Sequence, residues 1–249
     1  MGRAVADPRL NETSTFQLFG TAHIVAILLT LTVPFIFAAL SRRAKISALD
    51  RFVRYGLAAL MTINFIGYAV RASVSDGMSW RQTLPFQLCD WTMVVVIIAL
   101  VNGGRPRWLE VAYFWGIGGS LQAVLTPDLR FGFPDYRFLS FFIGHCGIPI
   151  GIIYLMLSRG FRPHLISVWR TLLWSEFYLV VTLIVDWITV VNYGFLLHKP
   201  VAFSILSYLS DDRPLYLMEM NGLALIFFAI LYAPFAMADV LAARARENA

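Results

Sequence analysis

The sequence predicts an all-α, polytopic membrane protein with seven transmembrane helices. Of its 249 residues, 59% are hydrophobic and 14% are charged, and the mean hydropathy is +0.69. Soluble domains carry about 25% charged residues. Apolar runs of about 20 residues, the length that crosses roughly 30 Å of hydrocarbon, recur along the whole chain. We therefore expect residues 1–249 to form a single membrane-embedded domain.

The predicted spans follow one another with short polar loops between them. Their approximate boundaries are residues 20–40, 52–71, 84–101, 108–125, 138–157, 168–191 and 215–241. Pro34, Pro149 and Pro234 fall inside the first, fifth and seventh spans, where each predicts a kink that frees a backbone carbonyl. The polar N-terminal segment has no small-residue cleavage site, so we interpret the first apolar run as a retained span.

Basic residues predict the orientation. They are concentrated in alternate loops and at the C-terminus, whereas the opposite loops mix both signs of charge; the concentrated set is Arg42, Arg43, Lys45, Arg51, Arg105, Arg107, Arg159, Arg162, Arg244 and Arg246. The positive-inside rule places the N-terminus outside and the C-terminus in the cytoplasm. These loop positions and anionic lipid headgroups explain the net charge of +5, so no nucleic-acid partner is predicted.

This topology gathers polar side chains near the outer ends of six spans. They lie about 5–12 Å below the outer edge at 1.5 Å per residue, and they are His23, Cys89, Asp90, Gln122, His145, Asp186 and Glu219. Each residue alone is compatible with snorkelling to the headgroups. Together they predict a shared polar pocket, because polar groups in hydrocarbon need partners. The segment from Pro127 to Pro134 is either a lid over this pocket or an ordinary turn.

The amino-acid sequences at the N-terminal ends of the spans are also similar in pairs. Span one opens FGTAH and span five opens FFIGH, while spans three and seven open LPFQLCD and RPLYLME. The pattern predicts a 3+1+3 parallel repeat, in which spans one to three and spans five to seven are similar units joined by span four. The two units would be related by an axis along the membrane normal. Such an axis would turn His23 toward His145, and Cys89–Asp90 toward Met218–Glu219, across one central pocket.

The pocket residues favour nucleophilic chemistry. A thiol attacks as its thiolate and needs a neighbouring base, and His145 is the natural base for Cys89, oriented by Asp186 or Asp90. This pair would suit acyl transfer through a thioester. The alternatives are that Cys89 is a small buried apolar residue and that His145 is a hydrogen-bonded core histidine. Cys146, about 100° around the helix from His145, is interpreted as structural.

Four motifs carry a resemblance to a known family: LPFQLC, SLQAVLTPDL, FPDYRFLSFFIGH and NYGFLLHKP, within residues 80–217. The chain resembles the bacterial YwaF-like integral membrane proteins, which are related to an animal seven-span acyltransferase that remodels ether phospholipids through a cysteine and a histidine. The resemblance implies Cys89 as nucleophile and His145 as its partner, with Gln122, Asn192 and Tyr193 as wall residues. It also implies a phospholipid or lysophospholipid substrate, a bacterial inner membrane and no cofactor. Gln87 stands where family members often have histidine.

Competing functions remain open. The main alternative is a proton-coupled transporter or channel, because parallel three-span repeats around a polar pocket are a transporter architecture. A zinc hydrolase is disfavoured because the four histidines include no His-x-x-x-His pair on a helix, so no metal site is predicted. A retinal protein is excluded because the lysines, Lys45 and Lys199, lie in loops. The sequence does not predict an oligomeric state.

Overall fold

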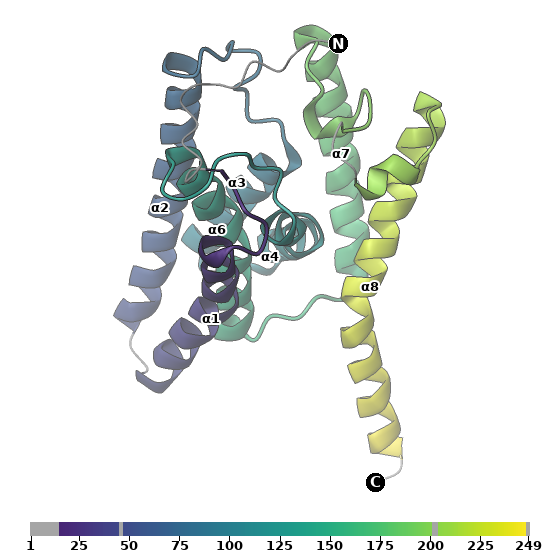
Figure 1. The fold of residues 1–249 in the computed structure, drawn as a ribbon. Helices are drawn as coiled ribbons and strands as arrows, with labels where there is room; N and C mark the ends of the chain where they lie inside the picture. The colour runs from purple at the N-terminus through teal and green to yellow at the C-terminus, as the bar shows by residue number, and fades with distance from the viewer. Residues whose placement is uncertain (1–14, 45–46, 201–203, 248–249) are drawn as a thin grey trace.

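The computed structural model describes residues 15–44, 47–200 and 204–247, and helices form most of this part of the chain (Figure 1). The elements, in order, are α1 (Thr21–Ala44), α2 (Ser47–Val74), α3 (Leu88–Val101), α4 (Pro106–Trp115), the π-helical turn η2 (Gly116–Ser120), α5 (Leu121–Leu125), α6 (Tyr136–Arg159), α7 (Leu165–Thr189), the 3-10 turns η3 (Tyr193–Phe195) and η4 (Ile205–Tyr208), and α8 (Arg213–Glu247). Of the predicted features, the polar N-terminal segment and Lys45 lie outside the described residues.

The expectation of a helical membrane protein is confirmed. Among the described residues, five helices are long and apolar enough to cross a membrane, namely α1, α2, α6, α7 and α8. The three predicted prolines lie inside α1, α6 and α8. The α3 helix is apolar but has only 14 residues, and α4, η2 and α5 follow one another without a loop.

The third predicted span begins later than expected. It was predicted from Leu84, but α3 begins at Leu88, with Gln87 as the residue before the helix. Pro85 lacks a backbone N–H and disfavours helical backbone at Leu84. The Asp90 carboxylate accepts a hydrogen bond from the Gln87 backbone N–H at 3.0 Å, which defines the helix start. At 1.5 Å per residue, 14 residues span about 21 Å, less than the roughly 30 Å of a bilayer core.

The fourth predicted span is also not a regular α-helix. Its middle, Gly116–Ser120, is a π-helical turn, and three of these five residues are glycines, which weaken an α-helix. Gly116 is needed for packing as well, because a Cβ at this position would overlap the side chain of Ile152 on α6. A close contact between α4 and α6 therefore coincides with the break in regular helix.

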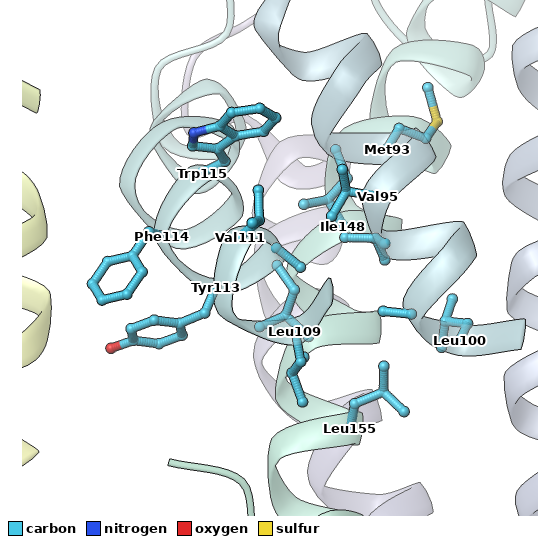
Figure 2. Close-up of a cluster of buried hydrophobic side chains, with 14 of the residues drawn as sticks. Met93, Val95, Leu100, Leu109, Val111, Tyr113, Phe114, Trp115, Ile148 and Leu155 are labelled. Atoms are coloured by element: carbon cyan, nitrogen blue, oxygen red, sulfur yellow. The ribbon is translucent and has the colours of Figure 1, made fainter. Parts of the chain in front are cut away.

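The helices form a main group with a second pair beside it. The α6 helix packs against α1, α2, α3 and α5, while α7 packs on α4 and α8 packs mainly on α7. The C-terminal half of α8 extends beyond the lower end of α7 (Figure 1). Figure 2 shows the apolar core between α3, α4 and α6, from which Tyr113 and Phe114 point away toward α8. The Tyr113 hydroxyl donates to the Leu231 carbonyl of α8 at 3.0 Å.

One face of α6 is made of small residues that let its neighbours approach closely. A Cβ on Gly147 would lie 3.0 Å from Met61 of α2, and a Cβ on Gly151 would lie 2.9 Å from Val96 of α3. Within a bilayer, where helix association depends on close packing, such small residues allow backbones to come together. The glycines of α6 therefore set its distance from α2 and α3.

A carboxylate joins the helices at the opposite end from the head of α3. Asp50 on α2 pairs with Arg54 at 2.9 Å and with Arg159 of α6 at 2.8 Å, and it accepts a hydrogen bond from the Tyr154 hydroxyl at 2.9 Å. The Arg54 guanidinium also donates to the carbonyl of Leu100 at the end of α3, at 2.6 Å. This network connects α2, α3 and α6.

The predicted repeat stays a prediction, but the contacts expected from it differ from those observed. Met218 is 70% exposed, and α3 packs on α2, α4 and α6. Cys89 and Asp90 therefore do not face Met218 and Glu219 across a central pocket. The short resemblance between span openings does not specify helix neighbours, because the packing of the intervening helices decides them.

Replacing Gly151 with valine should destabilise the helix group. The new branched side chain would meet Val96 of α3, and overpacking of this kind costs about 1–3 kcal/mol. Gly222→Val is the matched control, because a Cβ on Gly222 of α8 would meet no atom within 4 Å. Thermal unfolding in detergent measures both variants. An equal loss of thermal stability in the two variants would show that helix propensity, and not contact with α3, explains the effect.

Candidate functional site

A cavity of about 720 Å³ lies at the head of α3. This volume falls within the range of about 300–1,000 Å³ that is usual for small-molecule sites. Its walls come from α2, the non-helical segment before α3, the start of α3, the loop before α6, the first half of α6, and Tyr193 after α7. The polar residues among its lining are Asn64, Tyr68, Gln82, Thr83, Gln87, Cys89, Asp90, Asp128, Arg130, Arg137, Ser140, His145 and Tyr193.

Cys89 and His145, the predicted nucleophile and base, both line this cavity. Cys89 lies in the first turn of α3 and His145 near the middle of α6. The two helices touch beside them, because a Cβ on Gly144 would lie 4.0 Å from the sulfur of Met93, one turn after Cys89. The tertiary structure therefore brings the thiol and the imidazole to one cavity from separate helices.

Two contacts orient the His145 ring. Its Nδ1 lies 2.9 Å from the Phe141 carbonyl, and the ring stacks on the Phe141 ring with centroids 4.1 Å apart. A carbonyl oxygen only accepts hydrogen bonds, so Nδ1 carries the proton in the neutral ring and Nε2 keeps its lone pair. This tautomer is the one that a general base acting through Nε2 requires.

A buried hydroxyl lies beside the Cys89 thiol. Ser120, the last residue of the π-helical turn, is 1% exposed, and its side chain lies near Cys89. Its hydroxyl oxygen has no hydrogen-bond partner among the described residues. Single π-helical turns are frequent at functional sites. Here the turn carries a polar group toward Cys89 from a third helical segment.

The loop between α5 and α6 lines the mouth of the cavity with Asp128, Leu129, Arg130 and Phe131. Asp135 ends this loop and accepts a hydrogen bond from the Arg137 backbone N–H at 2.8 Å. The Arg137 guanidinium holds the pKa of the Asp135 carboxyl below its usual value, and it also lies over the ring of Phe131. The loop predicted as a possible lid thus forms part of the cavity wall.

The segment after α7 is attached to the head of α3. Gln87 accepts a hydrogen bond from the Gly194 backbone N–H at 3.1 Å, and Asp186 accepts one from Tyr193 N–H at 2.8 Å. The Tyr193 hydroxyl donates to the Arg81 carbonyl, and burial raises the pKa of Tyr193, which keeps this donor protonated. Gly194 has a φ of +58°, and a Cβ there would lie 2.5 Å from the Tyr178 hydroxyl.

The remaining predicted residues have other contacts. His23 is 1% exposed; its Nδ1 accepts from the Phe19 N–H at 2.9 Å and its Nε2 donates to the Val124 carbonyl at 2.8 Å. It is a core histidine outside the cavity lining, so it does not face His145 across the pocket. Gln122 donates to its own helix at Gly118, and Glu219 accepts from the Ser210 N–H.

Asn192 also lies outside the lining, although it was predicted as a wall residue. Its amide donates to the His198 carbonyl at 2.8 Å and accepts from the Leu197 N–H at 2.8 Å, so it maintains the shape of the loop that carries Tyr193. Asp186 likewise supports this loop and does not contact the His145 ring. Asp90, which does line the cavity, has a second role as the cap of α3.

Sequence reasoning missed Asn64 and Ser120. Asn64 lines the cavity from α2 and donates to the Ser140 carbonyl of α6 at 3.0 Å. An amide inside an apolar span was a detectable signal. Ser120 had no comparable signal, because serine is common in helices that cross membranes. Among the described residues, no group of three or more His, Cys, Asp or Glu side chains is arranged to hold a metal ion.

Comparison with known proteins identifies the family. The model of the TMEM164 family matches residues 18–232. The chain belongs to the TMEM164 family. An uncharacterized protein of Treponema pallidum (strain Nichols) is 31% identical over 152 residues, which cover 59% of this chain and 61% of that protein. No solved structure matches the chain.

The residues matched by the TMEM164 family model include every segment that lines the cavity. All four sequence motifs contribute lining residues: LPFQLC does so through Cys89, FPDYRFLSFFIGH through His145, and NYGFLLHKP through Tyr193. The fourth, SLQAVLTPDL, contributes Asp128 and begins with Ser120. Motifs that are far apart in the sequence therefore meet around one cavity.

Gln87→Ala should loosen the segment after α7. It removes the acceptor for the Gly194 N–H, and a lost hydrogen bond of this kind is worth about 1 kcal/mol. Amide hydrogen exchange of residues 192–198 should become about fivefold faster. Gln122→Ala is the matched control, because the Gln122 amide bonds only within its own helix. Unchanged exchange in Gln87→Ala would contradict the anchoring role.

Proposed function

We propose that this chain is a membrane lipid acyltransferase that works through a thioester on Cys89, with His145 as the general base. The observation that carries the proposal is that both residues line one cavity, from helices that contact each other at that depth. Two further observations support it. Among the described residues, His145 Nε2 has no hydrogen-bond partner, and the buried, unpartnered Ser120 hydroxyl lies near Cys89.

The reaction has two steps. His145 Nε2 takes the Cys89 proton as the sulfur attacks the ester carbonyl of a phospholipid; the C–S bond forms, the C–O bond breaks, and the proton passes to the leaving lysophospholipid oxygen. An acceptor hydroxyl then attacks the thioester, giving its proton to His145, and the C–S bond breaks. Cys89 recovers that proton. Water in place of the acceptor would make the enzyme a lipid hydrolase.

The cavity has the mixed lining that such a substrate needs. Apolar side chains, including Phe65, Leu84 and Phe141, offer surface to an acyl chain, and Arg130 and Arg137 in the lining offer guanidinium groups to a lipid phosphate. Among the described residues, the Arg130 guanidinium has no ion pair. Arg130 is therefore the better candidate for phosphate recognition, since Arg137 already pairs with Asp135 at 3.1 Å.

We further propose seven membrane crossings, with α3 and the α4–η2–α5 path as the two beyond the five long helices. Because α3 is short, the outer third of this crossing is the non-helical segment before α3. Non-helical backbone is tolerated there because it lines the polar cavity. We place the chain in a bacterial inner membrane, and the basic residues support an orientation with the N-terminus outside and the C-terminus in the cytoplasm. The cavity then opens toward the outer leaflet.

Proton-coupled transport is the less favoured function. A transporter needs an alternative path from the pocket to the other side of the membrane. Met93 and Ile148 line the cavity and also belong to the apolar core, and the core continues below them to Leu100 and Leu155 (Figure 2). The Asp50 network closes the far end. This packing favours a one-sided substrate pocket.

Cys89→Ala should abolish covalent labelling by an acyl donor. Purified protein in detergent is incubated with a phospholipid carrying a labelled acyl chain, and hydroxylamine-sensitive label on the protein is measured. Wild type and Cys146→Ala should be labelled equally, because Cys146 is buried against Ala26 away from the cavity. Label that persists in Cys89→Ala, or that disappears in Cys146→Ala, would contradict the assignment of the nucleophile.

His145→Ala should slow thioester formation by about 10²–10⁴-fold, the usual contribution of a general base. The single-turnover rate of labelling measures this effect. His164→Ala is the matched control, since His164 lies at the start of α7, outside the cavity lining. An unchanged rate in His145→Ala would exclude it as the base. Retained substrate flux in proteoliposomes containing Cys89→Ala would instead favour transport.

A further inference from the structure

A second cavity lies between α4 and α7 and shares no lining residue with the first. It has a volume of about 350 Å³. On α7 its lining residues are Arg170, Leu173, Trp174 and Phe177, which are spaced to share one helix face. This face is turned toward α4, on which α7 packs. We call this cavity the α4–α7 groove.

One end of the groove is charged. Arg170 pairs with Glu110 of α4 at 3.2 Å, and the Glu110 side chain is only 6% exposed. Arg107, one turn earlier on α4, is exposed and has no ion pair or hydrogen bond among the described residues. Two arginines and one carboxylate leave a net positive charge, and a guanidinium that is not paired is available for a phosphate.

The other end is apolar and faces outward. Phe177 lies two turns from Arg170, about 10 Å along the helix axis, and Leu173 lies between them. Leu173 is 70% exposed and Phe177 is 52% exposed. In a chain that spans a membrane, large apolar side chains exposed on a helix face contact lipid. The groove therefore changes from cationic to apolar along its length.

The charged end lies at the cytoplasmic side in the proposed topology. Both helices begin there, α4 at Pro106 and α7 at Leu165. The loops that precede them belong to the same end of the molecule, because Arg159 at the end of α6 donates to the Gly103 carbonyl at 2.8 Å. Arg107 and Arg170 thus lie near the headgroup level, and Leu173 and Phe177 lie deeper.

We propose that the α4–α7 groove binds an anionic phospholipid of the cytoplasmic leaflet, with its phosphate at Arg107 and Arg170 and one acyl chain along Leu173 and Phe177. The order of charge and apolar surface along the groove matches that of a phospholipid, and basic pockets between helices on the cytoplasmic side are typical sites for anionic headgroups. This lipid is separate from the substrate of the first cavity, so the proposal does not depend on acyl transfer.

The test measures lipid binding to the purified full chain by native mass spectrometry. The probes are phosphatidylglycerol and phosphatidylcholine with identical acyl chains, added to delipidated protein in a neutral detergent. Wild type should retain phosphatidylglycerol preferentially. Arg107→Gln should weaken that binding about fivefold, the effect of one basic residue near an anionic headgroup. Arg105→Gln is the matched control, because Arg105 precedes α4 outside the groove.

The variant Glu110→Gln should change the affinity for phosphatidylglycerol in the opposite direction. It frees Arg170 and raises the positive charge of the groove, so phosphatidylglycerol should bind about fivefold more tightly. Equal binding of both lipids by wild type, or equal weakening by Arg105→Gln and Arg107→Gln, would overturn the proposal. Displacement of phosphatidylglycerol by inorganic phosphate alone would also overturn it, because the site would then recognise a free anion and not a lipid.

Discussion

The close approach of α6 to α2 and α3 is the constraint on which the rest of the structure depends. Gly147 and Gly151 leave no room for a side chain against Met61 and Val96. In hydrocarbon, apolar surface gains little from burial, so helices associate through tight packing and small residues. One turn farther toward the head of α3, the helices leave room for the cavity that Cys89 and His145 line.

The cavity exists because α3 begins four residues later than the apolar run that starts at Leu84. A regular helix from Leu84 would have filled the space and satisfied its own backbone. Instead, Pro85 keeps the segment non-helical. The Tyr178 hydroxyl donates a hydrogen bond to the Phe86 carbonyl, and the Tyr193 hydroxyl donates one to the Arg81 carbonyl. The energetic cost of irregular backbone in this region is thus offset by hydrogen bonds from α7 and the loop after it.

The two ends of the molecule differ in how they are closed. At one end, Asp50 binds two arginines and a tyrosine, and the apolar core above it is fully packed. At the other end, polar side chains surround a cavity whose walls include two loops as well as α2, α3 and α6. This difference favours a site that exchanges molecules with one leaflet. The charged end of the α4–α7 groove lies toward the closed end of the molecule, so in the proposed topology the lipid proposed for this groove belongs to the other leaflet.

The sequence by itself determined the helical architecture, with helices long and apolar enough to cross a membrane, and the positions of the prolines within those helices. Apolar run length and axial position are local properties, so they are readable from the chain. The tertiary structure alone decided which side of each helix meets the cavity. His23 and Gln122 were predicted at the same depth, yet they lie outside the cavity lining, and Ser120 was not predicted although it lies near Cys89. Helix rotation and the late start of α3 depend on contacts with neighbouring helices, such as the α6 glycines against Met61 and Val96, and no single span encodes those contacts.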